Sequence, residues 1–180
     1  MSRPIRYDDA VLGSDYAQQD CSIARSLEVF GERWTLLIVR DAFYGVRRFN
    51  DFRDHLDIPK AVLSDRLSGL VEHGILTRTS DPRHAGRHLY ELTASGRALW
   101  PVLHAMLVWG DRHRQRNGRA FRHAVCGTEL GEAGGCTTCG LTPGPEEVVT
   151  APRRGRRARR TDRVAVALRA PHRLLTPLEV

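Results

Sequence analysis

The chain has 180 residues and a formal net charge of +7, and 41% of its residues are hydrophobic, which is enough for a compact core. It contains no apolar run that could span a bilayer and no signal-peptide pattern, so we expect a cytoplasmic protein without membrane contact. The charge is uneven, because residues 153–163 hold seven Arg and one Asp, residues 164–180 hold two Arg and one Glu, and residues 1–152 are left with 19 basic and 19 acidic side chains. The net charge is therefore no argument that the rest of the chain binds nucleic acid.

Apolar periodicity predicts two helices after a polar, acidic N-terminal arm, to which we assign residues 1–20. Ser22 is the expected N-cap of the first helix, and Gly31 is expected to end it. The second helix is expected to end at Gly45.

A short helix, a turn with a proline and a longer amphipathic helix come next. Asn50 is the expected cap of the short helix, which should end near Ile58 because the residue before a proline resists the helical backbone. The longer helix is expected from about residue 60 to residue 73, with a buried stripe that consists of Leu63, Leu67 and Leu70. This succession is typical of a helix-turn-helix.

Two short strands and a last helix complete this part of the chain. Residues 75–79 and 88–93 are predicted to pair as a hairpin around the loop 80–87, which would form a wing. Thr93 is the expected cap of a long last helix that Pro101 should kink. The predicted fold class is mainly α with a small β-hairpin wing, a winged helix-turn-helix.

The common use of such a fold is to bind DNA and read its sequence. A helix in the major groove presents its N-terminal side chains to base edges, and Lys60, Ala61, Ser64 and Asp65 hold that position here. Arg66 lies beside the buried stripe, where an ion pair or a phosphate contact is expected. The other candidates for contact with the DNA backbone or the minor groove lie before the short helix and in the wing: Arg47, Arg48, Asn50, Arg83, His84 and Arg87. The alternative is a winged helix that binds only protein.

Several motifs occur in order over residues 21–113, and they are Cys21-Ser22-Ile23, Glu32-Arg33-Trp34-Thr35-Leu36-Leu37-Ile38, Arg48-Phe49-Asn50-Asp51-Phe52, Leu63-Ser64-Asp65-Arg66-Leu67, Gly74-Ile75-Leu76, Tyr90-Glu91-Leu92-Thr93 and Trp109. Together they resemble the HxlR-type helix-turn-helix family, bacterial relatives of the MarR regulators. The resemblance implies a transcriptional regulator that forms a homodimer through its first and last helices and binds double-stranded DNA at a palindromic operator. It leaves room for a small-molecule effector.

The same resemblance singles out Cys21, which matches a cysteine that senses oxidants or electrophiles in some family members. A thiol at a helix N-terminus has a lowered pKa, so the position suits that chemistry. The alternative is an ordinary, semi-buried thiol beside a helix cap. A regulator whose DNA binding responds to redox state or metal through Cys21 or the cysteine cluster described next is thus a second hypothesis.

A second constellation lies after the helical region, where residues 117–150 are rich in glycine and cysteine. His123, Cys126, Cys136 and Cys139 follow the spacing H-x2-C-x9-C-x2-C, with a glycine after the second member of each pair. Four such ligands satisfy tetrahedral zinc and leave no open position, so a small structural zinc ribbon is predicted, with free thiols as the alternative. The His-x-Glu element of zinc deaminases is absent, and no nucleophile–base pair, phosphate loop or paired carboxylates suggest an enzyme.

The predicted organisation is therefore an arm over residues 1–20, a winged helix-turn-helix over 21–116, a cysteine-rich module over 117–150 and a disordered basic tail over 151–180. The tail is rich in Arg, Pro and Ala. It would bind any polyanion, with non-specific DNA affinity or a merely solvated segment as the two interpretations.

Overall fold

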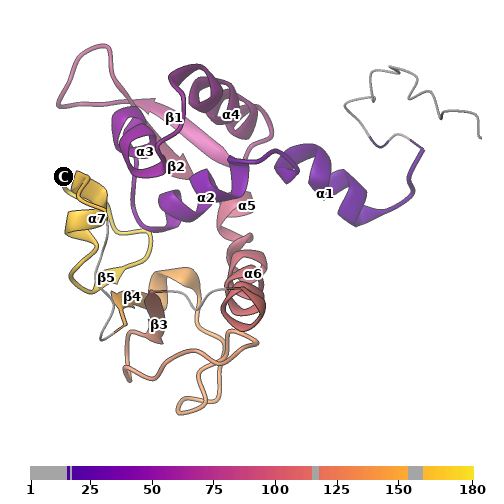
Figure 1. Ribbon diagram of the computed structural model, residues 1–180, viewed down its shortest axis with the longest axis vertical. Helices are drawn as coiled ribbons and strands as arrows, with labels where there is room; N and C mark the ends of the chain where they lie inside the picture. The colour runs from indigo at the N-terminus through magenta and orange to yellow at the C-terminus, as the bar shows by residue number, and fades with distance from the viewer. Residues whose placement is uncertain (1–15, 17, 115–117, 154–159) are drawn as a thin grey trace, which may run out of the picture. The chain divides into compact units, whose positions relative to one another are not determined.

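The computed structural model describes residues 16, 18–114, 118–153 and 160–180, and the chain divides into two units, Met1–Glu32 and Arg33–Val180 (Figure 1). In the first unit, α1 spans Ser22–Phe30. Its N-cap is Cys21, which has an extended backbone, so the prediction that Ser22 caps this helix is wrong by one residue. Most of the expected N-terminal arm lies outside the described residues.

Three helices form the centre of the second unit: α2 (Thr35–Phe43), α3 (Phe49–Leu56) and α4 (Lys60–Glu72). The stripe predicted for α4 is confirmed, because Leu63, Leu67 and Leu70 are all buried. They pack with side chains that α2 and α3 contribute to the same core, namely Ile38, Val39, Phe43, Phe52 and Leu56. Burial of these leucines fixes which face of α4 points away from the core.

The turn between α3 and α4 begins and ends close to the predicted positions. Arg48, with an extended backbone, is the N-cap of α3, so the prediction that Asn50 is the cap is wrong. At the other end, Asp57 adopts the left-handed conformation, with φ 54° and ψ 44°, and Pro59 directly precedes α4. The tight turn places α3 and α4 in the arrangement of a helix-turn-helix.

The wing is an antiparallel pair of strands, β1 (Leu76–Ser80) and β2 (His88–Leu92), in which Leu76 faces Leu92. Thr93 caps the next helix as predicted, because its hydroxyl accepts a hydrogen bond of 3.0 Å from the amide of Gly96. That helix, α5 (Ala94–Arg97), is short, and α6 (Trp100–His113) follows as a separate helix. The prediction of one long helix kinked at Pro101 is therefore wrong, because the chain forms two helices here. Pro101 lies in the first turn of α6, where a backbone amide would have no hydrogen-bond partner within the helix, so proline costs nothing there.

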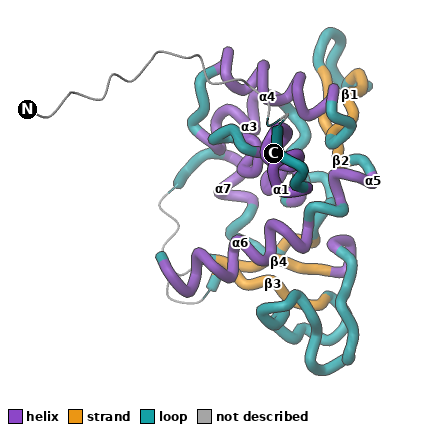
Figure 2. Tube along the Cα trace, turned by 90° about the vertical axis from the view of Figure 1, so that its right-hand side faces the viewer, coloured by secondary structure: helices purple, strands orange, loops and turns teal. Residues whose placement is uncertain are grey.

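A second, three-stranded antiparallel sheet follows, with the order β3 (Arg119–His123), β4 (Val148–Pro152) and β5 (His172–Arg173), and the short 3-10 helix η1 (Pro145–Glu147) leads into β4. It lies beside α6 (Figure 2). The ring of Phe121 on β3 is 5.5 Å from that of Trp100 on α6 and 6.5 Å from that of His104. The cysteine-rich region is therefore packed onto the winged-helix core.

The C-terminal segment differs from the predicted disordered tail. Residues 160–180 contain α7 (Arg163–Ala167) and β5 and bury four apolar side chains: Val164, Leu168, Leu174 and Leu178. The amide of Leu175 donates to the carbonyl of Phe43 at 2.8 Å, and that of Leu178 donates to Gly45 at 2.9 Å. The predicted disordered tail is therefore wrong for residues 151–153 and 160–180, while residues 154–159 lie outside the described residues. Within the described part of the chain, no helix is long and apolar enough to cross a membrane.

Asp162 attaches α7 to α3. Its carboxylate caps α7 by accepting a hydrogen bond from the amide of Ala165 at 2.9 Å, and it lies 2.8 Å from Nδ1 of His55 on α3. Burial alone would raise the pKa of Asp162, but the hydrogen bonds from Ala165, Arg160 and His55 outweigh it and lower the pKa to about 2. The charged form of Asp162 therefore stabilises the docked segment.

We expect Asp162→Asn, which keeps a good N-cap residue but removes the charge, to lower the free energy of unfolding at pH 7 by roughly 1–2 kcal/mol after allowance for solvent screening. Because the folded-state pKa of Asp162 is depressed, this stabilisation is present above about pH 4 and is lost as the pH falls toward 2. Urea unfolding at pH 7 and at pH 3 measures the difference. Equal stability of the two proteins at pH 7, or a gap that widens in acid, would contradict the assignment.

Candidate nucleic-acid interface and metal site

The N-terminal half of α4 presents an exposed face opposite its buried stripe. The four side chains predicted to read bases, Lys60, Ala61, Ser64 and Asp65, are all exposed on it. Arg66 makes an ion pair with Asp65 at 3.0 Å, one of the two contacts expected for it. The geometry thus brings the predicted base-reading set together on one accessible helix face.

Asp81 organises the wing, although no site prediction included it. It is buried, accepts a hydrogen bond of 2.9 Å from the amide of Arg83, and lies 3.2 Å from Nδ1 of His84 and 3.4 Å from Nε of Arg48. The bond from Arg83 contributes most to lowering the pKa of Asp81, and His84 and Arg48 add to it. A carboxylate in a loop between two strands, followed by proline, was the available signal, but only the fold shows that the side chain turns inward.

The contacts of Asp81 change the interpretation of two predicted DNA contacts. Arg48 connects the start of α3 to the wing through Asp81, and His84 contacts the same carboxylate within the wing, so neither side chain points only toward solvent. The backbone of the same segment joins the wing, because the amide of Tyr90 donates to the carbonyl of Arg47 at 2.9 Å. The Arg47 guanidinium is 2.6 Å from the carboxylate of Glu91. These residues hold the wing at a defined position relative to the helix-turn-helix.

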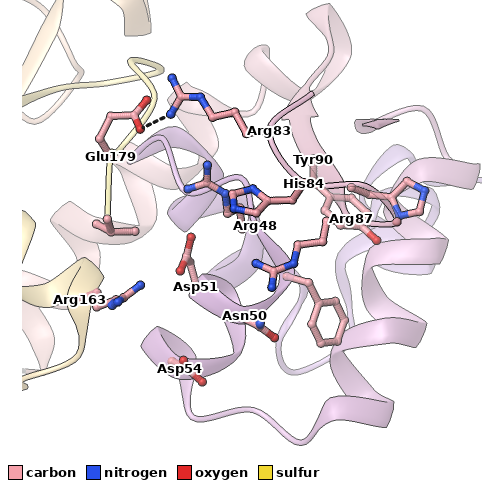
Figure 3. Close-up of a pocket in the computed structure, with 14 residues that line it drawn as sticks. Arg48, Asn50, Asp51, Asp54, Arg83, His84, Arg87, Tyr90, Arg163 and Glu179 are labelled. Carbon is pink, nitrogen blue, oxygen red and sulfur yellow. Dashed lines mark hydrogen bonds and ion pairs between the residues drawn. The ribbon is translucent and has the colours of Figure 1, made fainter. Parts of the chain in front are cut away.

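A polar cleft of about 670 Å³ separates the wing from α3 (Figure 3). Five predicted backbone-contact residues line it: Arg48, Asn50, Arg83, His84 and Arg87. The remaining one of that group, Arg47, does not line it. The C-terminal segment supplies a wall that the sequence did not predict, with Arg163 and Glu179, and Glu179 pairs with Arg83 at 3.1 Å. The cleft therefore brings cationic groups from three parts of the fold to the N-terminus of α3, together with the carboxylates of Asp51, Asp54 and Glu179.

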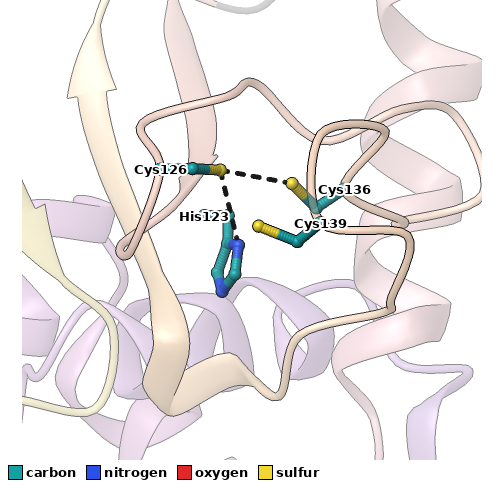
Figure 4. Close-up of side chains that lie close together, drawn as sticks. All are labelled: His123, Cys126, Cys136 and Cys139. Atoms are coloured by element: carbon teal, nitrogen blue, oxygen red, sulfur yellow. Dashed lines mark hydrogen bonds between the residues drawn. The ribbon is translucent and has the colours of Figure 1, made fainter.

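The four predicted metal ligands also come together. One ligand atom from each of His123, Cys126, Cys136 and Cys139 lies within 4.8 Å of all the others (Figure 4). The Cys126 Sγ atom is 3.3 Å from Cys136 Sγ and 3.5 Å from His123 Nδ1. Tetrahedral zinc with Zn–S bonds of about 2.3 Å and Zn–N bonds of about 2.0 Å separates its ligands by about 3.5–3.8 Å. The donor set and its spacing therefore fit a zinc ion.

Two similar turns hold the ligands. The amide of Gly127 donates to the carbonyl of His123 at 2.8 Å, and the amide of Gly140 donates to Cys136 at 2.9 Å. Both glycines have positive φ, 73° and 68°, which explains why glycine follows each second ligand. Hydrogen bonds from the hydroxyl and the backbone amide of Thr128 lower the pKa of the Cys126 thiol to about 6, which favours the thiolate that a metal binds. The hydrogen bond between Cys126 and Cys139 raises the pKa of the Cys139 thiol to about 11, so Cys126 is the first of these two ligands to lose its proton.

Cys21, the redox candidate, is exposed at the N-cap of α1. It belongs to the other unit of the chain and is not one of the four grouped ligands. Its role in sensing stays a prediction.

Comparison with known proteins agrees with this architecture. A family model described as HxlR-like helix-turn-helix matches residues 29–118. The HTH-type transcriptional regulator Rv3095 of Mycobacterium tuberculosis is 44% identical over 125 residues, which cover 66% of this chain and 77% of the relative. YdeP of Bacillus subtilis, also named an HTH-type transcriptional regulator, is 30% identical over 109 residues, 58% of this chain and 85% of YdeP.

Among solved structures, the chain is similar to PA1607, a transcription-factor candidate. The TM-score is 0.51 at 42% identity, and the match covers 54% of this chain and 68% of PA1607. The resemblance seen in the motifs is thereby confirmed, and with it the DNA-binding class. The chain belongs to the HxlR-like helix-turn-helix family of transcriptional regulators.

Proposed function

We propose that this regulator binds double-stranded DNA with the N-terminal half of α4 in the major groove and with the wing on the flanking backbone. The observation that carries the proposal is the exposed set Lys60, Ala61, Ser64 and Asp65, on a helix fixed in the core by Leu63 and its stripe. Lys60 and Ser64 can donate to base edges or phosphates, and Ala61 can contact a thymine methyl group. Arg83 and Arg87 line the cleft beside the wing, and their guanidinium groups can bind phosphates next to the groove.

We further propose that the active form is a homodimer. Val102, Met106 and Trp109 recur at helical spacing on α6 and are exposed, as are Ile23 and Leu27 on α1. Apolar rows of this kind are characteristic of surfaces that a partner covers. A symmetric dimer would place its two α4 helices about one turn of DNA apart, roughly 34 Å, and would select a palindrome.

The histidine and cysteine cluster is best explained as a structural zinc site. Its four ligands complete the coordination of a tetrahedral ion, so no position is left for a substrate. His123 and Cys136 are only 3% and 2% exposed, whereas Cys126 and Cys139 lie at the surface. The relatives are named as transcriptional regulators, which fits a protein whose metal supports the fold and carries out no reaction.

Selection of duplexes from a random-sequence pool tests the proposed function. The full chain is used, because residues 160–180 pack against the winged helix. Enrichment of a palindrome with half-sites one turn apart at near-physiological salt is the expected result. Binding without sequence preference, or no binding, would instead favour a winged helix that interacts with protein.

A further inference from the structure

The C-terminal segment 160–180 forms one wall of the cleft beside the wing, and it lies beyond the residues matched by the family model. Arg163, the first residue of α7, lines this cleft together with Asn50 and Asp51 from the first turn of α3 (Figure 3). On the opposite rim lies Arg87 of the wing. The segment thus contributes a cation to a surface otherwise made by the helix-turn-helix and the wing.

The segment is attached on both sides of Arg163. On one side, Arg160 donates to the carbonyl of Asp54 at 2.8 Å, and Asp162 lies 2.8 Å from His55. On the other side, Val164 and Leu168 are buried, and β5 pairs with β4 through Thr150 and His172. Such attachment reduces the entropy that Arg163 would lose on binding a ligand.

Some of the arginines in the cleft are already in ion pairs, and others are not. Arg48 and Arg83 are already paired, with Asp81 and Glu179. Within the described residues, the guanidinium of Arg163 forms no hydrogen bond and no ion pair. Its charge acts through space on Asp51. Burial raises the pKa of Asp51 above its ordinary value, and the charges of Arg48 and Arg163 offset part of that rise. Among the arginines that line the cleft, the guanidinium groups of Arg163 and Arg87 form no ion pair within the described residues, so an incoming anion can pair with either without breaking one. Arg163 is the one that the C-terminal segment contributes.

We propose that the C-terminal segment is part of the DNA-binding surface, with Arg163 binding a backbone phosphate of the duplex that α4 reads and Glu179 opposing that binding from the same cleft. The inference rests on the proposed function, because the phosphate belongs to DNA held by α4 and the wing. A phosphate at this place would also face the amides of the first turn of α3. Glu179 contributes a negative charge and holds Arg83 at 3.1 Å, so it weakens the attraction until Arg83 changes partner.

The test measures the affinity of the full chain for a selected duplex by fluorescence anisotropy over a range of salt concentrations. Arg163→Ala is expected to weaken binding roughly three- to tenfold and to make the slope of log K against log salt shallower by about 0.9, the value of one phosphate contact. Because a phosphate contact carries no sequence information, the loss should be about equal on a random duplex. Arg163→Lys should recover most of the affinity.

Glu179→Gln is expected to have the opposite effect and to tighten binding severalfold, since it removes a negative charge that faces DNA. A purely structural role for the segment would make both variants weaker. Two control variants alter exposed residues that do not line the cleft, Arg169→Ala on the same segment and Glu146→Gln on η1, and they should bind like the unaltered chain.

The outcomes separate the two claims. If Lys60→Ala with Ser64→Ala weakens binding while Arg163→Ala matches Arg169→Ala in affinity and salt slope, the inference is overturned and the proposed function stands. Weaker binding by Glu179→Gln overturns the opposing role. If the unaltered chain binds no duplex, both the proposed function and the inference are overturned. Circular dichroism confirms that each variant is folded.

Discussion

Cys136→Ser is expected to abolish stoichiometric zinc binding and to lower the free energy of unfolding by about 3 kcal/mol or more. Cys136 is buried and lies 3.3 Å from Cys126. A structural zinc ion contributes its binding energy directly to folding, and a serine hydroxyl does not replace a thiolate ligand. Zinc content by elemental analysis and thermal unfolding by circular dichroism measure the two effects. A metal chelator should lower the unfolding temperature of the unaltered protein in the same way.

The effect should extend beyond the cysteine turns. β3 continues into the ligand His123, β4 pairs with β3 and β5 pairs with β4, so loss of the metal loosens the sheet on which the C-terminal segment lies. Cys139→Ser, at an exposed ligand, should show the same loss of zinc. Because Cys139 is not part of the core, this variant distinguishes the effect of losing the metal from the effect of disturbing the packing around Cys136. Cys21→Ser is the matched control and should keep a full equivalent of zinc. Unchanged metal content or unchanged stability in both cluster variants would contradict a structural zinc site.

Lys60→Ala combined with Ser64→Ala is expected to lower affinity for a selected duplex by roughly 10- to 100-fold, because two single contacts with base edges at about 1 kcal/mol each, the lower end of the usual range, together give a loss of this size. Affinity for random duplexes should fall much less, so that the ratio of specific to non-specific affinity falls. Both residues are exposed, and thermal stability should stay within about 0.5 kcal/mol of the unaltered chain. Titrations with the two kinds of duplex measure the ratio.

Ser95→Ala, at an exposed position on α5 away from the cleft, is the control for this pair. It should leave both affinities unchanged. If the double variant keeps its preference for the selected duplex, α4 does not read the bases, and the proposed function loses its central observation.

The helix-turn-helix and the wing could be predicted from the sequence because their signals are local. The stripe of Leu63, Leu67 and Leu70 fixes the face of α4, Pro59 fixes the turn, and Thr93 caps α5. The predictions for the N-caps of α1 and α3 are wrong for the same reason. Cys21 and Arg48 hold the cap positions through their extended backbones, without a side-chain cap, so the polar residues Ser22 and Asn50 gave the wrong signal.

The C-terminal segment could not be predicted from composition. Its many arginines indicated disorder, although Val164 and Leu168, and then Leu174 and Leu178, keep the spacing of buried residues. The position of these residues depends on a distant part of the chain, because the carbonyls of Phe43 and Gly45 accept the hydrogen bonds that hold the last residues. Long-range pairing of this kind leaves no local trace.

The metal cluster was the more predictable of the two sites. Paired ligands with two residues between them, each pair followed by glycine, already specify the two turns that hold His123 and the cysteines. The DNA-facing residues were identified by position on α4, but sequence could not show that Arg48 and His84 share Asp81. It also could not place Arg163 and Glu179 beside them.

Methylation interference on a selected duplex tests the central claim most directly, because dimethyl sulfate modifies guanine N7 in the major groove and adenine N3 in the minor groove. If α4 of each protomer reads the major groove, N7 methylation should block binding in two clusters about 10 base pairs apart from centre to centre. Lys60→Ala with Ser64→Ala should weaken that interference. Binding that is insensitive to N7 methylation, or blocked at a single cluster, would contradict a dimer that reads DNA through α4.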